Sequence, residues 1–347
     1  MRKYGVRTIL DYSAEKDIQE SEAVNIVKQS LAEVVKEPNS RPNSALKEFE
    51  TSIKFADRSQ NVVSARTYFY ESEAKCDKNM EIFIDSIDSV VQSSGREGLC
   101  AIKLTALGRP QFLLQMSDFI VELQRLFELL ISDSKANLPS SIRSLDVHEF
   151  RRRLKELGIE INYDEESKWF TLLDHAHSCG VSVMVDAEQT YFQPAIRRLA
   201  MEMMRRFNKE SPIVFNTYQC YLKSAYSQMT QDMNVASIEN FSFGAKLVRG
   251  AYIDQERARA KELDYEDPTN PNFEATSRMY EKTLEAGMKE IVRRPEGSVS
   301  LMVASHNEDT IRFAIQKMKE FGIGNYTPSM CFAQLYGMCD NLSYALG

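Results

Sequence analysis

The feature that most constrains the fold is an alternation of short apolar runs with longer amphipathic stretches. Seven such runs occur, at residues 6–12, 100–107, 181–186, 213–218, 245–252, 299–305 and 329–335. Each run is mostly apolar rather than alternating, as expected for strands buried on both faces of a parallel sheet. The stretches between them carry apolar residues at helical spacing, as at Ile196, Leu199, Met203 and Phe207. We therefore predict an α/β fold in which helices connect parallel strands.

The number of strands indicates a barrel. A closed (β/α)8 TIM-like barrel needs eight strands and commonly forms as one domain of this length. The chain of 347 residues ends where an eighth strand would begin. We therefore predict a single domain over residues 1–347 that lacks the last strand and helix of the barrel. Polar segments at residues 13–61 and 134–166 are predicted insertions, the second with a helix-like piece around residues 147–157.

Composition excludes several classes of protein. Lys and Arg number 43 against 50 Asp and Glu, giving a net charge of -7, which does not suit a nucleic-acid surface. No apolar stretch approaches the roughly 20 residues of a transmembrane helix. The N-terminus is too soon interrupted to be a targeting peptide, and the six cysteines show no CxxC pairing.

One group of residues resembles metal ligands. His175, His177 and Cys179 lie close together in the sequence. Residues two apart on a helix do not share a face, and no other ligands cluster nearby. We therefore predict that the chain has no metal site.

Chemistry is expected where the strands end, because (β/α)8 barrels carry their reacting groups at the carboxyl ends of the strands. Lys103 and Asp186 are charged residues in buried runs, which is costly unless they are paired or functional. The structural alternative is an ion pair that closes the barrel. Gly250 follows the charged Arg249 and serves either packing or close approach of backbone to a ligand.

A second candidate region begins at His306. Asn307 or Asp309 is expected to cap a helix that ends at Gly322 and carries Ile311, Ile315 and Met318. A lone histidine at a strand end is commonly structural, yet a capped helix start also attracts anions such as a cofactor phosphate. No P-loop, GxSxG or GxGxxG motif occurs, which argues against a Rossmann cofactor domain and a serine hydrolase.

Long ordered blocks of the sequence resemble mitochondrial proline dehydrogenases. The blocks are SARTYFYESEAKCD (64–77), AIKLTALGRPQFLLQ (101–115), VMVDAEQTYFQPAI (183–196), FNTYQCYLK (215–223), GAKLVRGAYIDQERARA (244–260), VASHNEDT (303–310) and FAQLYGMCDNLS (332–343). The resemblance spans nearly the whole chain. It implies a distorted (β/α)8 barrel that holds FAD at its C-terminal face; a different flavin barrel, such as a methylenetetrahydrofolate reductase, fits the fold but not these blocks.

The resemblance also implies roles for individual residues. Lys103 and Asp186 match the catalytic lysine beside flavin and substrate and the aspartate paired near it. Asn216 stands where bacterial relatives have a glutamine that contacts the flavin ring. The cofactor-binding positions that it implies are Asn216, Lys246, Val248, Gly250, Ala251, Tyr252, Ser305, His306 and Asn307.

Lys246 is a departure from the bacterial pattern, because it replaces an arginine that faces the flavin. A fixed cation favours the negative charge that the flavin gains when it accepts hydride. Lysine supplies the charge but not the forked geometry of arginine, so we expect FAD binding to persist and the redox potential to differ.

The implied reaction is oxidation of L-proline to Δ1-pyrroline-5-carboxylate in proline catabolism. Hydride passes from proline C5 to flavin N5 and the electrons then pass to a quinone, with the protein at the matrix face of the inner mitochondrial membrane as a peripheral protein. In the family, adjacent arginines on the last helix grip the proline carboxylate, and this chain ends before that helix. The alternatives are a hydroxyproline dehydrogenase, or a catalytically impaired fragment that binds flavin only.

Overall fold

Seven parallel strands form one sheet in which each strand lies beside the next in the sequence, in the order β1 to β7. The structure is a computed structural model and describes residues 5–11, 47–49, 73–94, 98–108, 110–133, 163–324 and 327–347. The strands are β1 (Ile9–Asp11), β2 (Leu99–Ile102), β3 (Ser182–Val185), β4 (Val214–Gln219), β5 (Phe243–Val248), β6 (Val299–Ala304) and β7 (Met330–Ala333). Each falls in or largely within a predicted run, so the predicted α/β fold is confirmed.

The carboxyl ends of two predicted runs are not strand. After β2, a short 3-10 helix, η4 (Leu104–Ala106), turns the chain, with the Leu107 amide donating to the Leu104 carbonyl at 3.1 Å. After β5, the chain leaves the sheet at Gly250, whose φ of 126° is a backbone conformation that residues with a side chain rarely adopt. Both turns place the residues that follow at the rim of the sheet rather than inside it.

Helices follow most of the strands. They are α3 (Glu73–Ser94), α4 (Pro110–Asp133), α6 (Tyr163–Cys179), α7 (Gln193–Phe207), α8 (Ala225–Ile238), α9 (Ile253–Leu263), α10 (Phe273–Arg293), α11 (Glu308–Phe321) and α12 (Asp340–Leu346), with a 3-10 helix, η2 (Lys47–Phe49), before them. The helix predicted after His306 is confirmed as α11. Asn307 is its N-cap, since its side chain accepts from the Thr310 amide, and Gly322 ends it with a φ of 70°.

The two predicted insertions lie mostly outside the described residues. Within the first, residues 47–49 form η2, and the helix-like piece around residues 147–157 is not described. The last residues of the second predicted insertion, 163–166, belong to the helix α6. The sequence YDEE at the start of α6 has the acidic character that favours a helix start. At the other end of the chain, residues 340–346 form the short helix α12, at the place where the strand count predicts the start of a last strand.

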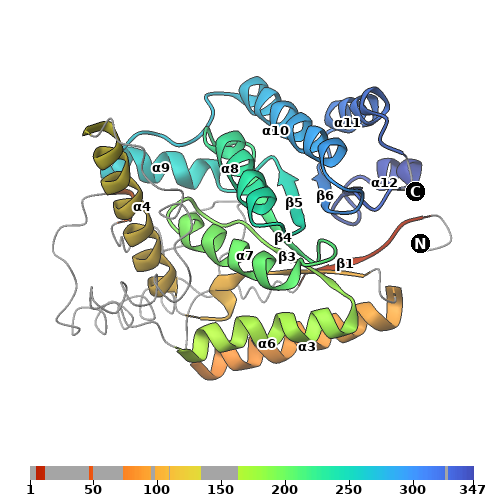
Figure 1. Cartoon of the computed structure of the whole chain (residues 1–347), viewed down its shortest axis with the longest axis horizontal. Helices are drawn as coiled ribbons and strands as arrows, with labels where there is room; N and C mark the ends of the chain where they lie inside the picture. The colour runs from red at the N-terminus through yellow and green to blue at the C-terminus, as the bar shows by residue number, and fades with distance from the viewer. Residues whose placement is uncertain are drawn as a thin grey trace.

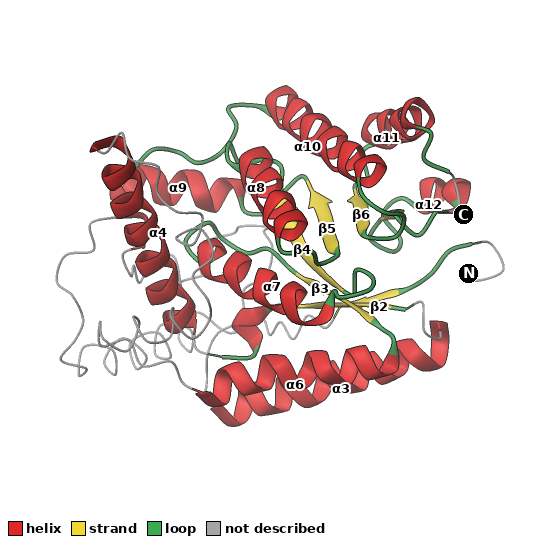
Figure 2. Ribbon diagram, in the orientation of Figure 1, coloured by secondary structure: helices red, strands yellow, loops and turns green. Residues whose placement is uncertain are grey.

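The sheet has a helix-covered outer face and an inner face (Figures 1 and 2). Helices α3, α6, α7, α8 and α10 pack on the outer face, where they bury the main core. The inner face holds a separate small cluster of Ala101, Met184, Phe215 and Met302. Because successive residues of a strand point to opposite faces, one strand can contribute side chains to both the outer core and the inner face.

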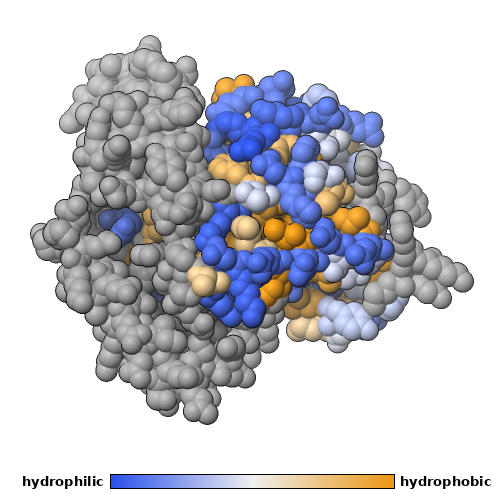
Figure 3. All heavy atoms as spheres, turned by 90° about the horizontal axis from the view of Figure 1, so that it is seen from below, coloured by the Kyte–Doolittle hydropathy of each residue, from blue (hydrophilic) through white to orange (hydrophobic). Residues whose placement is uncertain are grey.

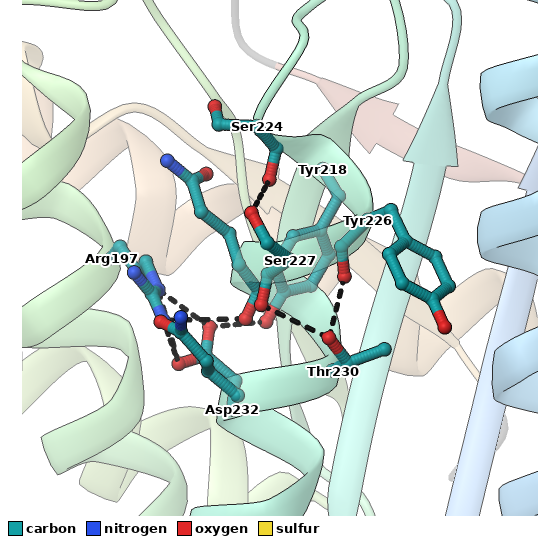
Figure 4. A network of polar contacts seen from close by, with 9 residues as sticks. Arg197, Tyr218, Ser224, Tyr226, Ser227, Thr230 and Asp232 are labelled. Carbon is teal, nitrogen blue, oxygen red and sulfur yellow. Dashed lines mark hydrogen bonds and ion pairs between the residues drawn. The ribbon is translucent and has the colours of Figure 1, made fainter.

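A polar network fastens α7 and α8 to the outer face of β4 (Figure 4). Arg197 of α7 forms a two-pronged contact with Asp232 of α8, with Nε 2.8 Å from Oδ2 and Nη2 2.8 Å from Oδ1. The hydroxyl of Tyr218, from β4, donates to the same Oδ2 at 2.7 Å. These three side chains therefore tie three elements together inside the core.

Polar side chains dominate the described part of the face seen in Figure 3. Figure 3 shows hydrophilic side chains over much of the described surface on one face, with apolar side chains gathered near its centre. Among the described residues, no helix is both long enough and apolar enough to cross a membrane.

Candidate active site

Three charged side chains meet at the carboxyl side of the sheet. Lys103 follows β2, Asp186 follows β3, and Lys246 lies in β5. Lys103 Nζ is 3.3 Å from Asp186 Oδ2, and Lys246 Nζ forms a short ion pair with Asp186 Oδ1. Each of the three side chains is only 12 to 14% exposed. We call these residues the Lys103–Asp186–Lys246 cluster.

The strand register explains why the cluster forms. The Asp186 amide donates to the Ile102 carbonyl at 2.9 Å, which brings the ends of β2 and β3 level. Lys246 pairs in register with Thr217 on one side and Met302 on the other, and Met302 belongs to the inner cluster. Because register partners in a parallel sheet point to the same face, Lys246 projects inward. The sequence predicted Lys103 and Asp186 as a pair, but not that Lys246 contacts the same carboxylate.

The cluster carries an excess of positive charge. Burial alone would raise the pKa of Asp186, but the two lysines outweigh it and hold that pKa below its ordinary value. Burial would lower the pKa of Lys103, but Asp186 overrides it and raises the pKa above the ordinary lysine value. Two ammonium groups thus share one carboxylate. Asp11 at the end of β1 adds a weaker negative influence on Lys103.

The turn after β3 is held by buried hydrogen bonds. The hydroxyl of Thr105 donates to Glu188 Oε2 at 2.7 Å, and Gln219 Nε2 donates to the Glu188 carbonyl at 2.7 Å. Burial raises the pKa of Glu188, even though Lys103 and Thr105 act in the opposite direction. Glu188 therefore lies close enough to Lys103 for the two side chains to influence each other's pKa.

A second carboxylate braces the same turn from α9. Both the amide and the hydroxyl of Thr190 donate to Glu256, at 2.7 and 2.6 Å. Burial raises the pKa of Glu256 to about 7, with the hydrogen bonds from Thr190 opposing the shift. The turn that carries Asp186 is therefore held by side chains from η4, β4 and α9.

The segment after β5 lies beside this turn. Val248 pairs in register with Gln219, so both belong to the face that carries Lys246. A Cβ at Gly250 would lie 1.6 Å from the ring of Tyr221, so this glycine is required by packing against that ring. Ala251 is exposed, whereas Tyr252 is buried beside Tyr221.

Arg249, the other charged residue of this segment, points away from the cluster. Its guanidinium donates to Ser277 Oγ at 2.9 Å and lies 4.2 Å from the centre of the Phe273 ring, both on α10. It is a helix contact rather than part of the inner face.

Ser305, His306 and Asn307 follow β6 at the same edge of the sheet. The Asn307 amide donates to Ser305 Oγ at 3.1 Å, and the Asn307 side chain caps α11. The exposed His306 ring accepts from the Leu335 amide at its Nε2, at 2.8 Å. The histidine therefore links the segment after β6 to the one after β7.

Asn216 is the predicted site residue that the structure sets apart from the cluster. It pairs in register with Val185 and Ala245, which belong to the outer core. The β4 residues on the side of Lys246 are Thr217 and Gln219. A two-residue period along β4, counted from the inward Phe215, is the signal that selects these two residues.

Three further residues of the region, Glu188, Gln219 and Glu256, were not predicted from the sequence. Glu188 carries a signal that sequence reasoning could use, since it is an acidic residue two positions after Asp186. Nothing in the sequence around Glu256 sets it apart from the other charged residues of α9.

The adjacent arginine pairs of the described residues serve as structural contacts. Arg197 binds Asp232 and Arg198 binds Glu202 on α7. The other pairs behave alike: Arg205 binds Glu239, Arg206 binds Asp174, Arg293 binds Glu290, and Arg294 donates to the Phe241 carbonyl. Each of these arginines is engaged away from the cluster.

A parallel α/β sheet with buried charges at its carboxyl edge is the arrangement found in enzymes of the α/β-barrel class. Comparison with known proteins identifies the family. The model of the family described as proline dehydrogenase matches residues 1–347. The chain therefore belongs to the proline dehydrogenase family of oxidoreductases.

Two proline dehydrogenases match over the whole chain. Proline dehydrogenase 1, mitochondrial, of Caenorhabditis elegans is 43% identical over 418 residues, covering 100% of this chain and 67% of the relative. The protein of that name from Homo sapiens is 40% identical over 413 residues, covering 100% and 68%. Hydroxyproline dehydrogenase of Rattus norvegicus is 36% identical and covers 80% of this chain and 61% of the relative.

Solved structures support the fold. Proline utilization A of Bdellovibrio bacteriovorus matches with a TM-score of 0.59 at 15% identity, over 79% of this chain and 25% of that protein. The counterpart from Bradyrhizobium japonicum matches with a TM-score of 0.59 at 16% identity, over 80% and 24%. The chain thus spans about a quarter of these solved chains and about two thirds of the first two relatives.

Proposed function

We propose that this protein oxidises L-proline to Δ1-pyrroline-5-carboxylate with FAD and passes the electrons to a quinone. The observation that carries the proposal is the Lys103–Asp186–Lys246 cluster, in which two buried ammonium groups share one carboxylate. A buried excess of positive charge at the carboxyl end of a barrel favours an anionic partner or one that gains negative charge during reaction.

The residues of the sheet edge fit a flavin cofactor. When bound, FAD supplies a two-electron acceptor whose reduction adds negative charge. Lys246 is the cation that would face that charge, and Lys103 would lie beside flavin and substrate. The segment Val248, Gly250, Ala251 and Tyr252 would border the cofactor, and Ser305, His306 and Asn307 would lie along its phosphates. Asn216, on the outer face of β4, would act through the strand rather than by contact, which leaves Gln219 as the amide on the inner face.

The protonation state of the cluster limits its role in catalysis. Lys103 has a raised pKa because of Asp186 and therefore keeps its proton near neutral pH. A lysine that holds its proton cannot accept one from the substrate amine. Asp186 acts by fixing both ammonium groups, and the amine proton leaves to solvent.

Proline is the proposed substrate rather than 4-hydroxyproline. The two proline dehydrogenases compared above match all of this chain, whereas the hydroxyproline dehydrogenase of Rattus norvegicus matches 80% of it. The relatives are named as mitochondrial, which supports a mitochondrial location for this protein. We place it as a peripheral protein at the matrix face of the inner membrane, where a membrane quinone accepts the electrons.

The test is anaerobic flavin bleaching. The purified chain is reconstituted with FAD, freed of excess cofactor and titrated with L-proline or with 4-hydroxy-L-proline while the flavin absorbance is followed. We expect a yellow protein that L-proline bleaches and that hydroxyproline bleaches much less. A colourless protein after reconstitution contradicts the proposal. Bleaching by hydroxyproline alone supports the other substrate, and a yellow protein that neither compound bleaches supports a fragment that only binds flavin.

A further inference from the structure

Helices α3 and α6 lie side by side along the outer face of the sheet (Figure 1). They run parallel, because Lys168 of α6 pairs with Asp77 near the start of α3 and His175 pairs with Asp88 farther along both helices. Three potential metal ligands gather where the helices face each other. One ligand atom from each of Asp88, His175 and Cys179 lies within 4.8 Å of the others.

His175 lies between the other two ligands. Its Nε2 is 2.8 Å from Asp88 Oδ1 and 3.8 Å from Cys179 Sγ. His175 and Cys179 are four residues apart on α6 and so share a helix face. His177 belongs to another face, with its ring centroid 6.0 Å from that of Phe207. The sequence argument against pairing His175 with His177 is thus correct, but it could not anticipate the carboxylate that α3 contributes.

We propose that Asp88, His175 and Cys179 form a zinc site, with water as the fourth ligand. Imidazole, thiolate and carboxylate are the three protein ligand types that zinc binds in tetrahedral geometry. Zinc–sulfur and zinc–nitrogen bonds of about 2.3 and 2.0 Å, at a tetrahedral angle, place the thiolate sulfur and the imidazole nitrogen about 3.5 Å from each other. The distance here is 3.8 Å. Magnesium and calcium are poor candidates, since they take oxygen ligands.

The surroundings permit an ion to enter. The side chains of His175 and Asp88 are 32% and 48% exposed, and Cys179 is partly exposed and free. Asp88 must move away from His175 by a few tenths of an ångström, because their hydrogen-bond distance of 2.8 Å is shorter than two zinc ligands allow. A half-exposed carboxylate on a helix surface makes that shift through its own rotamer.

An open fourth position is common in catalytic zinc sites, but the place of this site in the fold indicates a structural role. Cys179 ends α6 three residues before β3 begins, and α3 leads into β2. The site therefore lies toward the amino ends of these strands, opposite the Lys103–Asp186–Lys246 cluster, at the face of α/β barrels associated with stability. Bound zinc would link α3 and α6, the helices that precede β2 and β3, and Lys103 and Asp186 directly follow those two strands.

The experiment measures zinc binding to the whole chain and to matched variants. Chelator-treated protein is titrated with zinc by calorimetry, melted with and without zinc, and titrated with cobalt to detect thiolate-to-metal charge transfer. We expect one zinc per chain and a higher melting temperature with zinc. His175→Gln and Cys179→Ala should weaken binding more than about 100-fold, because even outer partners of metal ligands contribute 10–100-fold.

Two controls separate this site from other ligands. His177→Gln changes a histidine of the same helix on another face, and Cys339→Ala removes a partly exposed thiol elsewhere. Both should bind zinc and cobalt as the unchanged chain does. The proposal is overturned if no stoichiometric zinc binds, if the controls lose binding equally, or if Cys179→Ala retains the cobalt charge-transfer band. A cooperative melt without metal shows that His175→Gln or Cys179→Ala is folded. If one of these two variants does not fold, the cobalt spectrum of the other one tests the proposal. Flavin bleaching by proline is a separate readout, so either proposal can fail alone.

Discussion

Two buried charge networks lie on opposite faces of the same sheet. On the outer face, Arg197 and Asp232 form a balanced two-pronged pair that Tyr218 completes. On the inner face, Lys103 and Lys246 both pair with Asp186. The outer network matches its charges and donors, as a structural contact requires. The three residues of the inner cluster include one more ammonium group than carboxylates, and a reaction that develops negative charge can use that group.

The comparison predicts that removing one cation from each network has unequal effects on stability. Arg197→Met leaves Asp232 buried with only a hydroxyl partner, so the free energy of unfolding should fall by about 3–5 kcal/mol. Urea unfolding followed by circular dichroism measures the change. A fall of less than about 1 kcal/mol in the free energy of unfolding would contradict the structural role of the outer network, because the Arg197–Asp232 pair would then contribute no more than an exposed ion pair.

The turn beside the inner network should respond to pH. Burial raises the pKa of Glu256 from an ordinary 4.5 to about 7. The folded protein thus holds this proton more tightly than the unfolded chain, so the stabilisation is complete below pH 4.5 and is lost as the pH rises through 7. Between pH 5 and 8, the unchanged chain should lose about 2–3 kcal/mol relative to Glu256→Gln. Parallel slopes for the two proteins in urea unfolding across this range would refute the assignment.

Lys246→Met tests the surplus charge itself. Asp186 keeps Lys103 as a partner, so unfolding should change by less than about 2 kcal/mol. In protein reconstituted with FAD, the flavin midpoint potential should fall by about 30–60 mV, because a charge-assisted contact of about 1.5–3 kcal/mol is lost and 30 mV corresponds to about 1.4 kcal/mol. Spectroscopic reduction against a dye of known potential provides the measurement. An unchanged potential would show that Lys246 does not face the flavin.

The smallest effect is expected at an exposed pair. Arg206 and Asp174 are about half exposed. Arg206→Gln should change the free energy of unfolding by no more than about 1 kcal/mol, since water and salt screen such pairs. This variant is the baseline for Arg197→Met on the same helix. An equal fall in the free energy of unfolding for Arg206→Gln and Arg197→Met would mean that burial does not determine how much these ion pairs stabilise the fold.

Local features of the fold could be predicted from the sequence with good accuracy. All seven strands lie where apolar runs predicted them, and Asn307 and Gly322 bound α11 as their chemistry requires. The ends of β2 and β5 were predicted too far along, since the turn at η4 and the positive φ of Gly250 depend on neighbouring elements. The sequence did not predict the short helix α12, none of whose residues is buried, so that no core-facing side marks it.

The candidate site was predictable only in part. The cost of burying charge singled out Lys103 and Asp186, and the structure pairs them. Family resemblance marked Lys246 but not its contact with Asp186. For Asn216 the resemblance indicated a flavin contact, whereas the strand turns that side chain toward the outer core. The ligands Asp88 and His175 are 87 residues apart, so no local pattern could connect them.

The sequence by itself determined the order of the strands and helices and which residues carry charge into the barrel, because hydrophobic periodicity and helix capping act over a few residues. Only the tertiary structure decided which of those charges share a partner. On the inner face, strand register and pleat bring two lysines to one aspartate. On the outer face, the pleat of β4 turns Tyr218 toward Asp232, which α8 presents to Arg197 of α7. A shift of one residue in β4 would turn Tyr218 away from the outer network, and the same shift in β5 would turn Lys246 away from Asp186.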